Sequence, residues 1–214
     1  MNTESLTKRN LPHWDKADAA YFVTTCLEGS IPARGQLEIV RYRNHLRQRV
    51  PAAGISQTEW DNRVWKLSFA RAEQWLDREP AVRHLENPQL ARVVVDAMKY
   101  FAGTRYRLIA YAVMPSHFHW VFQPLPTWIE TMNPSPRSPR SRIVQSINRH
   151  TALRCNELLS QTGAFWQHES YDHWVRDDGE LERIIAYVEN NPVKAELVQA
   201  AEDLPFSSAY KHRK

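Results

Sequence analysis

Two neighbouring segments, residues 106–113 and 117–123, constrain the fold of this chain more than any other feature. The first is an almost continuous apolar run, as expected for a strand that is buried on both faces. The second alternates histidine with aromatic and aliphatic residues, which is the period of two typical of a strand. Met114, Pro115 and Ser116 lie between them and predict a turn. Together the two segments predict an antiparallel hairpin.

The rest of the chain divides into strand-like and helical segments. Residues 21–27 are rich in β-branched and aromatic side chains and predict a strand, and residues 170–176 predict a shorter one. Apolar spacings, of three and four in most segments and of three, four and five in 58–77, predict helices over residues 36–49, 58–77, 87–101, 142–159 and 178–190. In the 58–77 helix these apolar residues are Trp60, Val64, Leu67, Ala70 and Trp75. Residues 1–20 and the proline-rich connector 125–140 are expected to lack regular structure.

This order of elements predicts an α+β fold. An antiparallel sheet with helices packed on it, in a ferredoxin-like topology, is the economical arrangement. A length of 214 residues, 43% of them hydrophobic, fits one domain spanning residues 1–214 and excludes wholesale disorder. No apolar run approaches the length that spans a bilayer, and residues 1–10 lack the apolar core of a signal peptide. The chain has only two cysteines, too few for a disulfide framework. We therefore expect a cytoplasmic protein with no membrane partner.

The charge distribution favours a polyanionic partner. Lys and Arg outnumber Asp and Glu by 28 to 24, and the pI is near 9.1. Residues 131–156 contain no acidic side chain but several arginines, including Arg142 and Arg149, which lie two helical turns apart. We expect these two arginines and Arg176, at the end of the short strand, to contact phosphate or bases. The alternative is a solvated basic surface.

His117 and His119 are the first candidates for chemistry. Phe118, Trp120 and Phe122 share one face of their strand, so the two histidines lie together on the other face. Two imidazoles on one strand can bind a single divalent metal. Alternatively, they are solvent-facing side chains of a half-exposed sheet.

The helix near the C-terminus supplies two further candidates. Leu181, Ile184, Ile185 and Val188 follow core spacing, which places Tyr187 and Asn191 one turn apart on the flank of that stripe. Pro192 is predicted to end the helix just after Asn191. Read locally, Tyr187 is a boundary aromatic and Asn191 a helix cap. Read with the histidines, a metal held by His117, His119 and Asn191 could polarise a phosphodiester while the Tyr187 oxygen attacks phosphorus, because a phenol ionises more easily than an alcohol.

Several segments resemble one family. Residues 114–120 (MPSHFHW) resemble the His-hydrophobic-His (HUH) strand of single-tyrosine transposases. Residues 165–177 (FWQHESYDHWVRD) and 185–194 (IAYVENNPVK) resemble the signature of the transposases associated with repetitive extragenic palindromes (REP), and residues 11–14 and 21–24 resemble the opening of that family. The likeness is weakest from residue 35 to residue 88, and we interpret residues 35–101 as a helical insertion within the domain.

The resemblance implies an HUH endonuclease domain that acts on single-stranded DNA in transposition and recombination. Relatives of this kind use Mg²⁺ or Mn²⁺, recognise REP hairpins, and cleave them to leave a 5′-phosphotyrosine and a free 3′-OH. His117 and His119 match the HUH histidines, Asn191 the third metal ligand, and Tyr187 the nucleophile. Two imidazoles and an amide form a softer ligand set than Mg²⁺ prefers, so Mn²⁺ is expected to bind better in vitro. Tyr171 is the second choice of nucleophile, because it lies in the strand signature rather than on the helix.

Two other functions remain open from the sequence. A protein of this fold could bind a nucleic-acid hairpin as a regulator without cutting it. It could also hydrolyse a phosphodiester with metal-bound water, in which case Tyr187 would be structural. The sequence leaves a monomer and a homodimer equally open.

Overall fold

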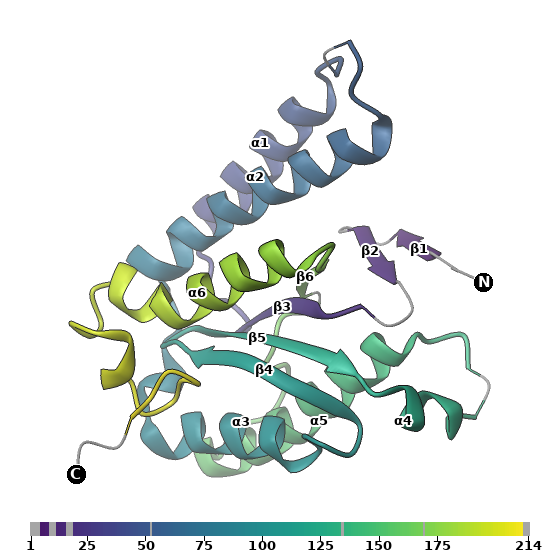
Figure 1. Ribbon diagram of the computed structural model, residues 1–214. Helices are drawn as coiled ribbons and strands as arrows, with labels where there is room; N and C mark the ends of the chain where they lie inside the picture. The colour runs from purple at the N-terminus through teal and green to yellow at the C-terminus, as the bar shows by residue number, and fades with distance from the viewer. Residues whose placement is uncertain are drawn as a thin grey trace.

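The fold is built on one four-stranded antiparallel sheet, in the order β4-β5-β3-β6. The computed structural model describes residues 5–8, 12–15, 19–51, 53–133, 135–168 and 170–211. The strands of the sheet are β3 (Tyr21–Cys26), β4 (Tyr106–Val113), β5 (His117–Pro124) and β6 (Tyr171–Trp174). The predicted hairpin is β4 and β5, and the predicted α+β class with an antiparallel sheet is confirmed (Figure 1). The two central strands of the sheet are the first and third of the four in chain order, as in a ferredoxin-like sheet.

One face of the sheet carries the main hydrophobic core. Phe118, Trp120 and Phe122 of β5 are fully buried on this face, as the alternation predicts. Two helices, α3 (Pro88–Tyr100) and α5 (Pro139–Leu159), cover it from below in the view of Figure 1. His117 and His119 of β5 therefore lie on the other face of the sheet.

The opposite face is covered as well, by α6 (Asp178–Lys194) and the C-terminal half of α2 (Gln57–Arg78). Its apolar residues include Phe22 of β3, Phe69 of α2 and Val188 of α6. This cover rules out the half-exposed sheet that the sequence left open. Both α2 and α6 therefore lie on the face of β5 that carries His117 and His119.

The helices α1 (Ala33–Arg47) and α2 form a hairpin that projects away from the sheet beyond α6 (Figure 1). Near its tip, Leu46, Trp60 and Val64 form a small core of their own. At the N-terminus of α2, Ser56 and Glu59 form a capping box. The predicted insertion 35–101 thus contains this hairpin and also α3, which packs under the sheet; its status as an insertion stays a prediction.

The sequence predicted only part of the buried stripe of α2, in which Trp60 and Val64 are buried as expected. Leu67 and Ala70 are exposed, whereas Trp65, Phe69 and Leu76 are buried. The helix has apolar residues on more than one side, so spacing alone does not select the buried face.

Several other elements of the described chain were not predicted. Within residues 1–20, β1 (Ser5–Lys8) and β2 (Pro12–Asp15) form an antiparallel pair, and residues 1–4, 9–11 and 16–18 lie outside the described chain. The proline-rich connector contains the short helix α4 (Pro126–Glu130). Its first residue is Pro126, and a proline is compatible with the first turn of a helix. Two short 3₁₀ helices are η1 (His84–Glu86) and η2 (Ala201–Asp203). Over the described ranges, no helix has both the length and the apolar character needed to cross a bilayer.

Candidate active site

The centre of the site is the pair of histidines on β5. His117 and His119 point to the same face and have no exposed surface. Their Nε2 atoms lie 3.0 Å apart. One residue, Phe118, separates the two histidines, so the alternation that buries Phe118 on one face places both imidazoles together on the other.

The hydrogen bonds around His117 define which nitrogen carries its proton. The Leu76 carbonyl of α2 can only accept, so the Ser116 hydroxyl donates to it, over 3.3 Å. Ser116 Oγ lies 3.0 Å from His117 Nδ1 and therefore accepts a hydrogen bond from Nδ1–H. The Nε2 lone pair of His117 is consequently directed away from this chain of hydrogen bonds, toward His119.

Thr24 of β3 plays the corresponding part for His119. The two residues are register partners across β3 and β5, and Thr24 Oγ1 lies 2.7 Å from His119 Nδ1. A hydroxyl can donate or accept as it rotates. His119 can therefore place its proton on Nδ1 and leave the Nε2 lone pair for a metal.

Both imidazoles are held in their neutral form. Burial and, as a smaller cause, the positive charge of Lys194 lower the pKa of His117 to about 3. Burial, then the neighbouring His117 and then Lys194, hold the pKa of His119 well below its usual range. Neutral imidazoles are the form that ligates metals.

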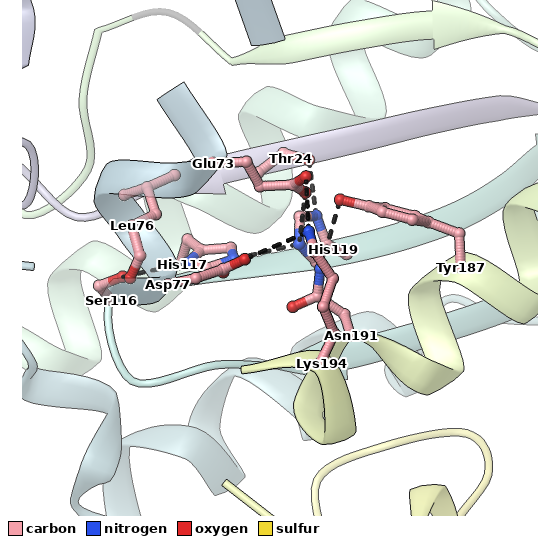
Figure 2. A network of polar contacts seen from close by, with 10 residues as sticks. All are labelled: Thr24, Glu73, Leu76, Asp77, Ser116, His117, His119, Tyr187, Asn191 and Lys194. Atoms are coloured by element: carbon pink, nitrogen blue, oxygen red, sulfur yellow. Dashed lines mark hydrogen bonds and ion pairs between the residues drawn. The ribbon is translucent and has the colours of Figure 1, made fainter. Parts of the chain in front are cut away.

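Helix α6 positions Tyr187 and Asn191 beside the histidines, as the spacing predicts. Asn191 Nδ2 donates a hydrogen bond to the Tyr187 hydroxyl, over 3.3 Å. The Tyr187 ring meets the His119 ring edge to face, with centroids 5.8 Å apart. Figure 2 shows the Tyr187 hydroxyl pointing toward the centre of the cluster.

Pro192 does not end the helix, contrary to the prediction. Helix α6 continues to Lys194 with Pro192 inside it. The backbone N–H of Ala195 donates to Asn191 O, and that of Leu197 donates to Pro192 O, so the last turn is closed without the missing proline donor. This extra turn brings Lys194 to the site.

A second set of charged residues reaches the site from the helical hairpin, and the sequence analysis missed it. Glu73 Oε1 lies 3.7 Å from His119 Nε2, and Lys194 Nζ lies 3.4 Å from both Glu73 Oε2 and Asp77 Oδ2. Burial raises the pKa of Glu73 to about 7, opposed by Lys194 and reinforced by Asp77. The available signal was an acidic residue four positions after Phe69, on what proves to be the buried stripe of α2.

The chemistry of the residues fits a divalent cation. The described chain offers no three His, Cys, Asp or Glu side chains already arranged to hold a metal. The amide of Asn191 can complete the set, because its Oδ1 is buried and accepts no hydrogen bond from any described residue. Two converging imidazole nitrogens and this oxygen are suitable ligands for Mn²⁺ or Mg²⁺.

The other predicted residues lie outside this cluster. Arg142 and Arg149 are on α5, which packs on the opposite face of the sheet. The exposed Arg176 lies between β6 and α6. Tyr171 is across Thr24 from His119 in the sheet, but its ring is buried against Phe69, with centroids 5.2 Å apart.

Comparisons with known proteins point to one group of relatives. The chain is 26% identical over 112 residues to a Haemophilus influenzae protein named "Putative REP-associated tyrosine transposase". The match covers 50% of this chain and 60% of the relative, so the chain spans less than two thirds of that protein's length. No protein-family model matches. A solved structure of a REP-associated tyrosine transposase bound to a REP hairpin aligns with 90% of this chain and 77% of its own, at 17% identity and a TM-score of 0.48.

Proposed function

We propose that this chain, a distant homologue of the REP-associated tyrosine transposases, nicks and rejoins single-stranded DNA at hairpins through Tyr187. The observation that supports this most is the position of the Tyr187 hydroxyl. It accepts a hydrogen bond from Asn191, and the Tyr187 ring packs against His119, whose Nε2 faces that of His117. A nucleophile and a pair of neutral imidazoles thus converge where a phosphodiester would react.

The reaction exchanges one phosphodiester bond for another. The Tyr187 oxygen forms a bond to phosphorus while the bond from phosphorus to the 3′ oxygen breaks. The phenolic proton leaves the tyrosine, and the departing 3′ oxygen takes up a proton to become a free 3′-OH. A cation held by His117, His119 and Asn191 would act as a Lewis acid on the phosphate. The 5′-phosphotyrosine retains the bond energy, so a 3′-OH can reverse the step and rejoin a strand.

The residues around the site have assigned tasks in this proposal. Asn191 orients the Tyr187 hydroxyl through its Nδ2 and offers its Oδ1 to the cation. Ser116 holds the His117 proton on Nδ1, and Thr24 can accept a hydrogen bond from Nδ1–H of His119, which leaves both Nε2 lone pairs for a cation. The apolar surroundings, including Phe22, which meets Tyr187 edge to face, exclude water that would compete with the 3′-OH.

Arg142, Arg149 and Arg176 stay predicted DNA contacts. Because α5 lies on the face away from the histidines, its arginines would contact a part of the DNA remote from the cleaved bond. Arg176 lies on the connection between β6 and α6, and α6 is the helix that carries Tyr187 and Asn191. Replacing a phosphate-contacting arginine by alanine lowers the slope of log affinity against log salt by about 1.

One observation favours a second function, hairpin binding without cleavage. His117 and His119 have no exposed surface, so DNA cannot reach them unless α2 or α6 shifts. A protein that never made this shift would bind a hairpin without cutting it. The monomer and the homodimer stay equally open.

The experiment incubates end-labelled single-stranded oligonucleotides with the protein and Mn²⁺. The oligonucleotides carry hairpin-forming sequences taken from the DNA that flanks the protein's own coding region. We expect a covalent protein–DNA adduct, which Tyr187→Phe abolishes and Tyr171→Phe, its matched control, does not. Binding without cleavage would support the regulator, and cleavage without adduct would support hydrolysis; either result overturns the proposal.

A further inference from the structure

The helical hairpin delivers a buried carboxylate to the histidine pair. Glu73 lies near the C-terminal end of α2 and is only 4% exposed. Its Oε1 faces His119 Nε2 at 3.7 Å and has no hydrogen-bond partner among the described residues. A buried carboxylate oxygen is rarely left without a partner, because its desolvation costs several kcal/mol.

The distances suit a shared cation. Neighbouring ligands of an octahedral cation, each about 2.1 Å from it, lie about 3.0 Å apart, and opposite ligands about 4.2 Å. The Nε2 atoms of His117 and His119 have the first separation, 3.0 Å. The 3.7 Å between Glu73 Oε1 and His119 Nε2 lies between the two values. A shift of about 0.7 Å toward His119 would give Glu73 Oε1 the separation of a neighbouring ligand.

The charges of the site also call for a carboxylate. His117, His119 and Asn191 would contribute no negative charge to a dication buried among them. A buried charge is stable only when it is paired. Glu73 supplies a negative charge from α2, on the same face of the sheet as the histidines. Its carboxylate oxygen is also a harder ligand than an imidazole nitrogen, and Mg²⁺ prefers hard oxygen ligands.

Lys194 orients this carboxylate. Its Nζ lies 3.4 Å from Glu73 Oε2 and 3.4 Å from Asp77 Oδ2, two contacts that Figure 2 marks with dashed lines. The Lys194 ammonium thus pairs with Oε2 of Glu73, while Oε1 of the same carboxylate faces His119.

We propose that Glu73 is a further metal ligand, contributed by the hairpin of α1 and α2 and oriented by Lys194. The proposal rests on the divalent cation of the proposed function. It gives the hairpin a direct part in the site, since α2 would supply both the Glu73 ligand and the Leu76 carbonyl that fixes the His117 proton.

The test measures Mn²⁺ binding to the full chain without DNA, by calorimetry and by electron paramagnetic resonance. Glu73→Gln keeps the shape of the side chain and removes its charge. Asp77→Asn is the matched control, because it removes a carboxylate from the same Lys194 without facing His119. Circular dichroism establishes that each variant is folded.

We expect Glu73→Gln to weaken Mn²⁺ binding about tenfold or more. In the electron paramagnetic resonance of Glu73→Gln, exchange into D₂O should reveal one more water bound to Mn²⁺ than in the parent chain. The couplings from the histidine nitrogens to Mn²⁺ should persist. Asp77→Asn should change the affinity less than threefold and leave the water count unaltered. The inference is overturned if Glu73→Gln binds as the parent does, or if both variants weaken binding equally with no added water.

The same titration separates this inference from the proposed function. Loss of binding in His119→Ala together with unchanged binding in Glu73→Gln would overturn only the role of Glu73. Absence of Mn²⁺ binding in the parent chain would overturn both.

Discussion

Asn191 donates a hydrogen bond from Nδ2 to the hydroxyl of Tyr187, one helical turn away on α6, over 3.3 Å. The other end of the same amide, Oδ1, is buried and has no hydrogen-bond partner in the described part of the chain. One side chain can thus orient the nucleophile and ligate the cation. These two tasks are separable by substitution.

Asn191→Asp retains the oxygen and removes the N–H donor, whereas Asn191→Leu removes both. We expect the aspartate variant to keep Mn²⁺ affinity and to form adduct more slowly, because its carboxylate disfavours the tyrosinate beside it. The leucine variant should lose metal affinity about tenfold. Calorimetry and adduct kinetics measure the two effects. Equal loss of metal binding in both variants would show that Oδ1 is not a ligand.

Ser116→Ala tests the orientation of His117. Without the Ser116 hydroxyl, His117 Nδ1 loses its acceptor and the Leu76 carbonyl loses its donor. We expect Mn²⁺ affinity to fall about 10- to 100-fold, the usual cost of losing such a supporting hydrogen bond. Ser68→Ala is the matched control, since Ser68 Oγ is buried in α2 with no hydrogen-bond partner among described residues. Similar affinities in the two variants would contradict the assigned proton positions.

Glu180 links α6, β6 and α2, and its contribution to stability depends on pH. It accepts a hydrogen bond from the Arg176 backbone N–H and pairs with His173 and Lys66. Burial alone would raise the pKa of Glu180, but these three partners lower it from 4.5 to about 2. A carboxyl whose pKa falls on folding stabilises the native state above its unfolded pKa, and this contribution is lost as the pH drops through the folded pKa.

Glu180→Gln should therefore lower the free energy of unfolding at pH 7 by about 1–3 kcal/mol. The difference from the parent chain should persist down to about pH 4.5 and shrink as the pH approaches 2. Urea unfolding at several pH values measures it. A difference that is the same at pH 7 and pH 2.5 would show that the ionised carboxylate is not what stabilises the native state.

Gly35→Ala tests the packing of α1 against α2. Alanine favours a helix over glycine by about 1 kcal/mol, but a Cβ at Gly35 would lie 2.8 Å from Trp75 Cδ2. We expect a net loss of stability of about 1–3 kcal/mol from overpacking. At Gly179 in α6, a Cβ would meet only side-chain ends at 3.3 Å and 3.4 Å, so Gly179→Ala should be close to neutral. A more stable Gly35→Ala variant would contradict this packing.

The parts of the fold that the sequence predicted are those set by local periodicity. Alternation along residues 117–122 determines which side chains enter the core, so the facing of the histidines followed without the structure. The spacing of Leu181, Ile184 and Val188 likewise placed Tyr187 and Asn191 on one flank of α6.

The parts that it did not predict depend on contacts between distant segments. The packing of α2 determines whether the histidine face of the sheet is covered. Because α2 has apolar residues on more than one side, the spacing does not show which side packs on the sheet. Glu73 and Lys194 meet across 121 residues, which no spacing rule connects. The extra turn after Asn191 forms because later backbone donors close it, although the residue before a proline usually leaves the helix.

The most direct test locates the residue that becomes attached to DNA. The adduct formed with Mn²⁺ is digested with protease and nuclease, and mass spectrometry identifies the tyrosine that carries the nucleotide. The account predicts the modification on Tyr187. Modification of Tyr171 or of any other residue would contradict it.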